Sequence, residues 1–534
     1  MYTTQNNPVL HFKPTSSFML AEKLNQIRHV HLFKFILSSL FFISQSAFSN
    51  NIKIQNLQFN AYEEASGVVS IVLDLSWDHS WYYTAQGPGN YDAAWIFFKY
   101  LGIDGIWHHA YLDEYQIPYN SATIEIPDDS DGKRKGAFIY QQHPGANTFS
   151  EMENLVFTGL PVRLELSGTG IVPPASPVIM KAFAIEMIYV PEGSFFAGSP
   201  DPTGCIIDED TDSIDVFAFS MTEITTSDAR VDPVEIDYYH AGGYPYGQPV
   251  PASSDFPNGF NGFYCMKYEL TQSQYVDFLN CLNSEEAAIR YFKWDELEAD
   301  TEGDGEIDNF SQKEASRYEI HKTDTGYISL NPYLALNYLS WTDGAAYADW
   351  AALRPMTELE YEKVCRGDKI PVIGSYAWGS EKIYGLEYDI ENVGQENEII
   401  SNPAILSTDL GNALFNKTED RDNQGAVRVG IFAATATASG GIPNRMQTGG
   451  SYYGIMELTG NVMDRCIGVQ KDTVDITNPE CEILGSALFD GRNGDGELLN
   501  GTANVHTWPV SDGSDETSGV AARGGSFIKN YMRA

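Results

Sequence analysis

The amino-acid sequence predicts an all-β region of sandwich type, followed by a larger α+β region that is rich in coil. Three observations predict this: short segments of alternating polarity before residue 176, helix-capping patterns among strand patterns after residue 185, and a proline-rich stretch between the two regions. We expect an all-β domain over residues 50–176, a linker over 177–184 and a second domain over 185–534. A chain of 534 residues is long enough for two domains.

The first 49 residues have the pattern of a signal peptide. Lys23 and Arg28 precede the apolar run Phe35–Ile43, and residues 47–49, Ala-Phe-Ser, form a cleavage site of small residues. The apolar run is too short to cross a bilayer. Met19 is an alternative start, because the residues before it lack the charge pattern of such a peptide. We therefore expect an exported protein, secreted or at the cell surface, whose mature chain has no membrane-spanning segment.

The composition limits the classes of partner. The chain has 73 acidic and 33 basic residues and a net charge of -40, which disfavours binding to nucleic acid or to anionic lipid. Six cysteines in an exported chain of this length permit disulfides but are too few for a disulfide scaffold. Their pairing stays open. They are Cys205, Cys265, Cys281, Cys365, Cys466 and Cys481.

The front region contains three clear strand patterns. Residues 68–77, 94–100 and 122–126 are rich in β-branched and aromatic residues, and no helical periodicity competes with them. A cluster of aromatic residues begins at the end of the first pattern. It is either a sugar-stacking platform or part of the core packing, and we favour core packing. Its members are Trp77, Trp81, Tyr82 and Tyr83.

The second region combines strands at 186–190 and 263–269 with three helices. Thr271 with Gln274 and Thr357 with Glu360 form capping boxes, which predict a helix start at each place. A third helix is expected over residues 342–352, with Trp341, Ala345 and Ala348 on one face. Long irregular stretches separate these elements, as is typical of a coil-rich α+β domain.

Five motifs in this region resemble the formylglycine-generating enzyme (sulfatase-modifying factor) family. They are MIYVPEGSFFAGS, YCMKYELTQSQYVDFLN, NYLSWTDGAAYADWAALRPMTELEYEKVCRG, YGIMELTGNVMD and ARGGSF, and they occur in the family's order over residues 185–534. The resemblance implies a C-type-lectin-like fold. It also implies a further strand beyond Ala534, so we expect that a C-terminal piece is missing from this sequence.

The resemblance also implies where copper chemistry would be carried out, and those positions are altered. The two copper-binding cysteines of the enzymes fall on Lys529 and Ala534, and the family serine beside them falls on Ser526. Met463 replaces the family's indole after the Gly-Asn pair. Neither lysine nor alanine can replace a thiolate toward Cu(I), so we expect no copper and no catalytic residues. Related iron oxygenases need histidines on an added helical domain that this chain lacks.

Calcium is the cofactor that the resemblance still allows. One family site maps onto Glu457, Gly460, Val462 and Asp464, all of which offer hard oxygen donors. A second site would begin at Asn392 and Val393 and continue near Asp420 or Asp422. The acidic stretch 300–308 imitates part of a calcium loop, but Ser311 stands where a bidentate glutamate is needed.

Two functions remain at this point. The first is an exported, non-catalytic member of the family that acts as a binding or structural scaffold for a protein or glycan at the cell surface. Bacterial members of the family use the fold in this way. The alternative is a formylglycine-generating oxidoreductase that acts on a protein cysteine, or a related metal-dependent oxygenase.

Overall fold

The computed structural model describes most of the chain from Asn51 onward. The described residues are 51–83, 89–127, 131–142, 149–166, 169–171, 178–198, 206–207, 214–215, 221–228, 256–293, 317–401, 406, 408–415, 425–438, 444–468, 489–509 and 519–527. The predicted signal peptide, Lys529, Ala534, Asp420, Asp422 and the acidic stretch 300–308 all lie outside them.

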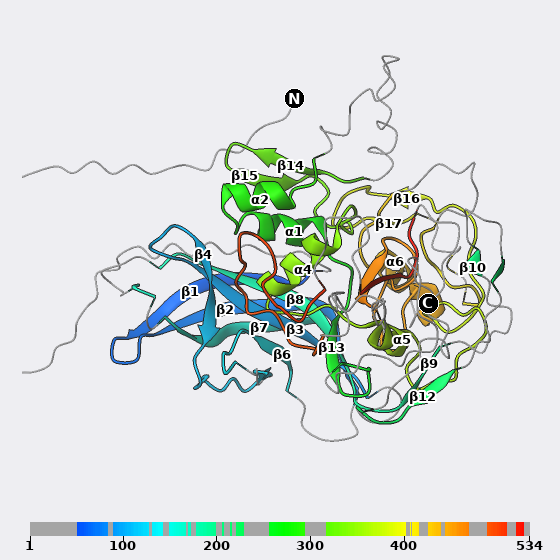
Figure 1. Cartoon of the computed structure of the whole chain (residues 1–534), viewed down its shortest axis with the longest axis horizontal. Coiled ribbons are helices and arrows are strands. Elements are labelled where there is room, and N and C mark those ends of the chain that lie inside the picture. The colour runs from blue at the N-terminus through cyan, green and yellow to red at the C-terminus, as the bar shows by residue number, and fades with distance from the viewer. Residues whose placement is uncertain are drawn as a thin grey trace, which may run out of the picture. The chain divides into compact units, whose positions relative to one another are not determined.

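The front region is rich in strands, as expected (Figure 1). Its strands and those that continue its sheet are β1 (Lys53–Glu63), β2 (Val68–Tyr83), β3 (Asp92–Leu101), β4 (Trp107–Leu112), β5 (Ala122–Glu125), β6 (Ala137–Gln141), β7 (Phe149–Glu165), β8 (Met180–Val190) and β13 (Phe263–Met266). They form one nine-stranded sheet in the order β1-β2-β7-β4-β3-β6-β5, in which β8 pairs with β3 and β13 pairs with β8. The pairs between neighbouring strands are antiparallel.

The second region mixes helices with short strands. The remaining strands are β9 (Phe195–Ala197), β10 (Ile206–Ile207), β11 (Ile214–Asp215), β12 (Thr222–Ile224), β14 (Ile320–Thr323), β15 (Gly326–Ser329), β16 (Ile390–Glu391), β17 (Ile399–Ile400), β18 (Asp464–Ile467) and β19 (Val520–Arg523). The helices are α1 (Gln272–Leu279), α2 (Ser284–Arg290), α4 (Trp341–Trp350), α5 (Glu358–Arg366), α6 (Ile431–Ala438) and α7 (Arg445–Thr448).

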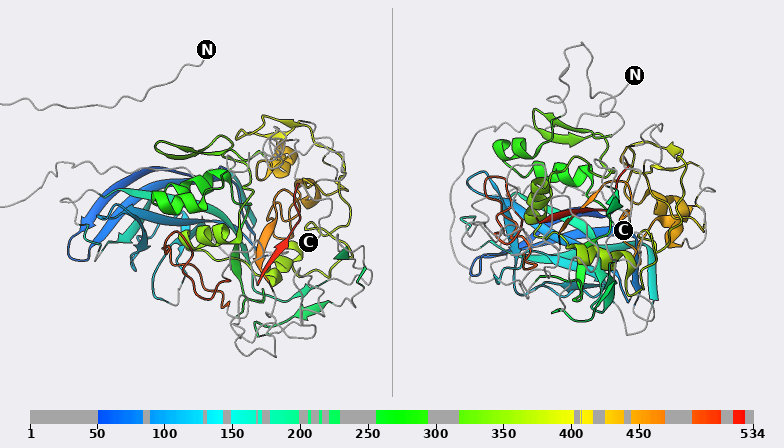
Figure 2. Two further views of the ribbon diagram at one scale, coloured as in Figure 1. Left: turned by 45° about the horizontal axis from the view of Figure 1, so that its top comes forward. Right: turned by 45° about the vertical axis from the view of Figure 1, so that its right-hand side comes forward.

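Strand β3 is buried on both faces because its apolar run has no polar alternation. Ala94, Ile96 and Phe98 enter the core shared with β2 and β7, whereas Trp95 and Phe97 enter a second core with α1 and α4. A strand that is covered on both faces has a continuous apolar sequence of this kind. Figure 2 shows the green helices beside the blue strands, which agrees with this packing. Strand β3 is therefore the central strand between the two regions.

The predicted helix starts are confirmed. The Thr271 hydroxyl accepts the Gln274 N–H while the Gln274 side chain accepts the Thr271 N–H, and Thr357 and Glu360 repeat the arrangement in α5. The third helix, α4, begins at Trp341 behind a Ser340 cap. Its Trp341 and Ala345 side chains share one core, as the spacing predicts.

Strand β8 begins inside the segment that we expected to be a linker. Residues 180–184 are hydrogen-bonded to β3 and buried on both faces. The prediction of a linker is therefore wrong for these five residues. The sequence suggested a linker because of the prolines at 173, 174 and 177, but β-pairing starts directly after them. Leu40–Ala534 forms one compact unit.

A buried ion group crosses this junction. Lys267 pairs with Glu186 of β8, and its ammonium lies 4.8 Å from the centre of the Trp81 ring. Asp92 of β3 accepts hydrogen bonds from Trp77 Nε1 at 2.7 Å and from the Trp81 N–H at 3.0 Å. Trp77 is fully buried, so the core-packing interpretation of that aromatic residue is confirmed. Among the helices of the described ranges, none is long and apolar enough to span a membrane.

Candidate functional site

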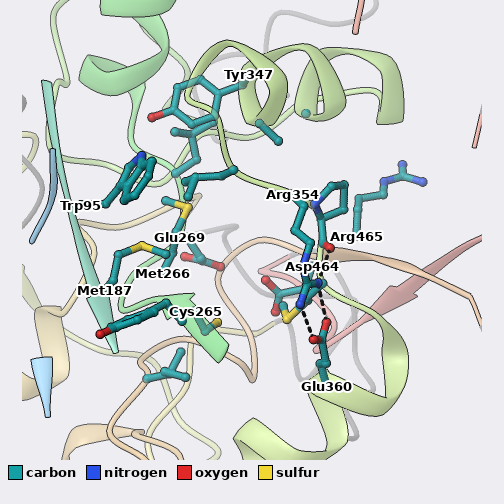
Figure 3. Close-up of a pocket in the computed structure, with 18 of the residues that line it drawn as sticks. Trp95, Met187, Cys265, Met266, Glu269, Tyr347, Arg354, Glu360, Asp464 and Arg465 are labelled. Atoms are coloured by element: carbon teal, nitrogen blue, oxygen red, sulfur yellow. Dashed lines mark hydrogen bonds and ion pairs between the residues drawn. The ribbon is translucent and has the colours of Figure 1, made fainter. Parts of the chain in front are cut away.

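A cavity of about 670 Å³ lies where the front strands meet the second region (Figure 3). Trp95 of β3, Glu125 at the end of β5 and Phe138 of β6 line it from the front region. The other walls come from β8, β13, α4 and the turn before β18. The volume lies within the range of roughly 300–1,000 Å³ that is usual for ligand sites.

The walls of the cavity are mostly apolar and rich in sulfur. Five methionines contribute to the lining, together with the thiol-bearing Cys265. Methionine side chains are flexible and polarizable, so they adapt to ligands of irregular shape. The five are Met187, Met266, Met356, Met456 and Met463. Met187 and Met266 are direct cross-strand partners between β8 and β13, which places both on one wall.

Charged groups stand at defined points of the lining. Arg354 donates to Glu360 from both guanidinium nitrogens, at 2.8 and 2.5 Å, so these two charges neutralise each other. Glu269 accepts the Asn461 side-chain amide at 2.5 Å and the Val462 N–H at 2.9 Å. In Figure 3, Trp95 and Met187 lie on one side of the cavity and Arg354, Glu360 and Asp464 on the other.

Glu125 is held by tyrosine hydroxyls. Tyr264 and Tyr140 both donate to its Oε2, at 3.0 and 3.1 Å, and Tyr91 lies 3.0 Å from Tyr264, hydroxyl to hydroxyl. Burial raises the pKa of Tyr91 to about 12 and also raises the pKa of Tyr140 and Tyr264, so all three remain neutral donors. Within the described ranges, Glu125 has no ion-pair partner.

The predicted calcium turn brings two carboxyl groups close enough to interact. Glu457 and Asp464 repel each other, and both act on Glu269. Burial, ahead of every other cause, raises the pKa of Glu457 to about 8 and of Asp464 to about 7, and raises that of Glu269 well above its usual value. Glu457 Oε1 accepts the Gly430 N–H at 2.8 Å. Glu457 Oε2 and Asp464 Oδ2 are buried and have no hydrogen-bond partner among the described residues.

These orphaned oxygens fit a hard cation. An unpaired buried carboxylate is costly, and a bound divalent ion removes the cost. The turn itself needs glycine, because a Cβ on Gly460 would lie 2.5 Å from the Leu414 carbonyl and its φ is +86°. Among the described residues, no three His, Cys, Asp or Glu side chains form a metal-binding group. A calcium ion there would depend on the two carboxylates and the backbone carbonyls of Gly460 and Val462.

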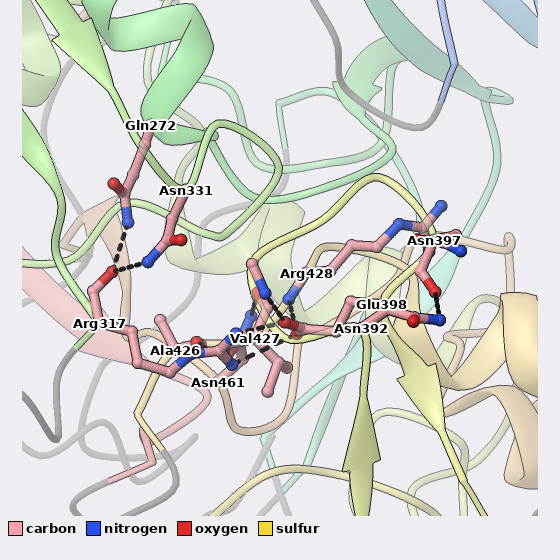
Figure 4. Close-up of polar contacts among 11 residues, drawn as sticks. Gln272, Arg317, Asn331, Asn392, Asn397, Glu398, Ala426, Val427, Arg428 and Asn461 are labelled. Atoms are coloured by element: carbon pink, nitrogen blue, oxygen red, sulfur yellow. Dashed lines mark hydrogen bonds and ion pairs between the residues drawn. The ribbon is translucent and has the colours of Figure 1, made fainter. Parts of the chain in front are cut away.

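The second predicted site fits calcium less well (Figure 4). The Asn392 side-chain amide donates to the Asn397 carbonyl at 3.2 Å, and the Val393 side chain is 61% exposed. The buried carboxylate of this loop, Glu398, accepts from the Arg317 guanidinium and from the Arg428 N–H. An arginine therefore already supplies the positive charge that Glu398 needs.

The positions onto which the resemblance maps the copper site are only partly described. Ser526 is 6% exposed, and its hydroxyl has no hydrogen-bond partner among the described residues. It does not line the cavity, whereas Met463 does. Four cysteines are described, and all four carry buried free thiols. Burial raises the pKa of each, to about 11 for Cys281, so none is a ready thiolate.

Sequence reasoning did not identify Glu125 or Glu269 as site residues. Both carry a signal that is visible afterwards: Glu125 is the only charged residue in the strand pattern at 122–126, and Glu269 stands two residues before the N-cap of α1. Their convergence on one cavity depends on the pairing of β3 with β8, which no local pattern encodes.

Comparison with known proteins identifies the second region. The family model described as the sulfatase-modifying factor enzyme 1-like domain matches residues 180–534. The matched range begins at the first residue of β8 and includes α4, the Gly460–Asn461 turn and β19. No curated protein and no solved structure matches the chain. Because the match covers more than half of the sequence, the chain belongs to the formylglycine-generating enzyme family of sulfatase-modifying factor domains.

Proposed function

We propose that this chain is an exported, non-catalytic member of its family that binds a protein segment in the cavity between the front strands and the family domain. The cavity carries this proposal. It has the size of a ligand site, and Trp95, Glu125 and Phe138, which precede the family match, form one of its walls. The front region is thus an integral part of the site.

The chemistry of the lining favours a peptide over a glycan. Sugars need many hydrogen-bonding groups, but this lining consists largely of methionine, leucine, alanine and aromatic side chains. Lys529 and Ala534 at the positions of the copper-binding cysteines disfavour oxidation of a substrate cysteine. The predicted signal peptide supports a binding event outside the cell. We further propose calcium at the Glu457–Asp464 turn, where it would stabilise one wall of the cavity.

Gly344 offers a clean way to test the cavity. It lines the cavity from within α4, and a Cβ added there meets no atom within 4 Å. Gly344→Trp should place an indole in the cavity from a position where the Cβ itself has room, and Gly344→Ala is the matched control. Both substitutions remove a glycine from a helix. Replacing a helix glycine by alanine increases the free energy of unfolding by roughly 0.5–1 kcal/mol.

The experiment is selection of random heptapeptides displayed on phage, with purified chains as bait and a glycan array in parallel. Wild type and Gly344→Ala should enrich the same peptides, and Gly344→Trp should lose them. Binding confined to glycans would contradict the choice of ligand. Conversion of a sulfatase-motif peptide thiol to an aldehyde, with copper and oxygen present, would contradict the non-catalytic assignment.

A further inference from the structure

One carboxylate of the cavity has no cationic partner among the described residues. Arg354 pairs with Glu360, Glu269 accepts hydrogen bonds from the Asn461 side chain and the Val462 N–H, and Asp464 belongs to the turn where calcium is proposed. Glu125 differs, because its two tyrosine partners are neutral donors that orient the carboxylate and supply no opposing charge. The front wall therefore presents an oriented carboxylate beside an apolar surface.

The surroundings determine which charge the site attracts. The lining has four carboxyl groups and two guanidinium groups, and the whole chain has a net charge of -40. The field of a strongly negative chain attracts ligands of the opposite sign. An anionic ligand is disfavoured, and a cationic group gains both from Glu125 and from the field of the chain.

The geometry around Glu125 also distinguishes an ammonium from a guanidinium. Both tyrosine hydroxyls donate to Oε2, and among the described residues no group donates to Oε1. A guanidinium binds a carboxylate best through two parallel hydrogen bonds to both oxygens. An ammonium is a compact point charge and is satisfied by one oxygen together with nearby aromatic rings. Tyr264 and Phe138 supply such rings, stacked with centroids 3.6 Å apart.

We propose that Glu125 seats the ammonium group of a lysine side chain, which belongs to an otherwise apolar peptide segment bound along the methionine-lined wall. This inference rests on the proposed function, since it assigns the ligand class of the same cavity. Tyr140 and Tyr264 act as positioning residues that aim the carboxylate. The apolar walls account for the rest of the segment.

The test begins with peptides that wild type and Gly344→Ala enrich and Gly344→Trp does not. A single lysine should recur among them. Calorimetry then compares the best peptide with versions that carry norleucine or arginine in place of that lysine. We expect about tenfold weaker binding for norleucine and a loss of several fold for arginine. Glu125→Gln, which keeps an oxygen for the tyrosines, should weaken the lysine peptide about tenfold and leave the norleucine peptide unchanged.

The control is Glu153→Gln, an exposed glutamate of β7 that makes the same change in net charge. It should bind all three peptides as wild type does. Equal binding of the lysine and norleucine peptides would overturn the inference about Glu125. If the Gly344→Trp variant still failed to bind these peptides, the cavity would remain the binding site. Equal binding of the arginine peptide would overturn the preference for ammonium. The absence of any peptide that depends on Gly344 would instead refute the proposed function.

Discussion

Replacing Lys267 by methionine should destabilise the whole folded unit, because the side chain neutralises carboxylates from both regions. Lys267 is 2% exposed, Glu186 is 2% exposed and Asp92 is 1% exposed. Burial alone would lower the pKa of Lys267, but the charges of Glu186, Tyr268 and Asp92 outweigh it and raise that pKa. Methionine has a similar volume and removes only the charge. Glu186 and Asp92 would then lose the buried cation that offsets their charge.

The size of the effect follows from this burial. Removal of one partner of a buried ion pair costs about 3–5 kcal/mol. For a cooperative unit as large as Leu40–Ala534, the entropy of unfolding is roughly 1 kcal/mol per degree, so the melting temperature should fall by about 3–5 °C. Burial raises the pKa of Asp92, and Lys267 opposes that rise. Without Lys267, Asp92 should hold its proton to higher pH, so the deficit should be smaller at pH 5 than at pH 8.

Differential scanning calorimetry measures both the fall in melting temperature and its dependence on pH. The proteins compared are wild type, Lys267→Met and an exposed control, Lys322→Met. A single transition that shifts as a whole is expected, because β3 and β8 belong to one sheet. Adding Glu186→Gln to Lys267→Met should recover part of the loss. The reasoning is refuted if Lys267→Met melts within 1 °C of wild type at pH 8. It is also refuted if the lower-melting transition involves residues 50–176 alone.

Three other outcomes are expected. Millimolar calcium should raise the melting temperature by about 3 °C at a hundredfold excess over Kd; EDTA should reverse this, and Asp464→Ala should abolish the response. In EDTA, wild type should lose stability as the pH rises from about 4.5 to 8, because the folded-state pKa of Glu457 lies near 8. Glu457→Gln should flatten this dependence of stability on pH. Parallel stability profiles for the two proteins would refute the role of Glu457. Gly460→Ala should lower the melting temperature, because the added Cβ would lie 2.5 Å from the Leu414 carbonyl; a wild-type melting temperature would show that the turn can shift.

The sequence predicted the parts of the fold that depend on local interactions. The capping boxes at Thr271 and Thr357 involve residues three apart, so their geometry is encoded in a few neighbouring side chains. Trp341 and Ala345 likewise share a helix face by spacing alone. The strand at 186–190 was also predicted, but its first six residues were not, because the nearby prolines suggested a linker.

The parts that escaped prediction depend on contacts between distant residues. Glu125 and Tyr264 are 139 positions apart in the chain, and Lys267 and Glu186 are 81 apart. Neither pair has a spacing that marks it as a contact. The ion pair between Glu398 and Arg317 was not predicted for the same reason. This ion pair weakens the fit of calcium to the loop at Asn392. The cavity exists only because β3 accepts β8 as its neighbour.

The residues that carry the family resemblance make structural contacts with one another. The resemblance therefore predicts the architecture better than the activity. Gly460 donates its N–H to the Gly524 carbonyl at 2.8 Å, and the Phe527 N–H donates to the Asn461 carbonyl at 2.8 Å. These bonds join the Gly-Asn turn to the Gly-Gly-Ser segment through the backbone alone. The Asn461 side chain accepts the Val427 N–H at 2.9 Å and so adds a third segment.

None of these contacts requires a thiol. A chain can therefore keep the turn, the Gly-Gly-Ser segment and the fold around them whatever side chains follow Phe527. The same scaffold then leaves Met463, Val462 and Asp464 on the wall of a cavity whose opposite wall comes from outside the family domain. Function in this chain is accordingly to be sought where the two regions meet.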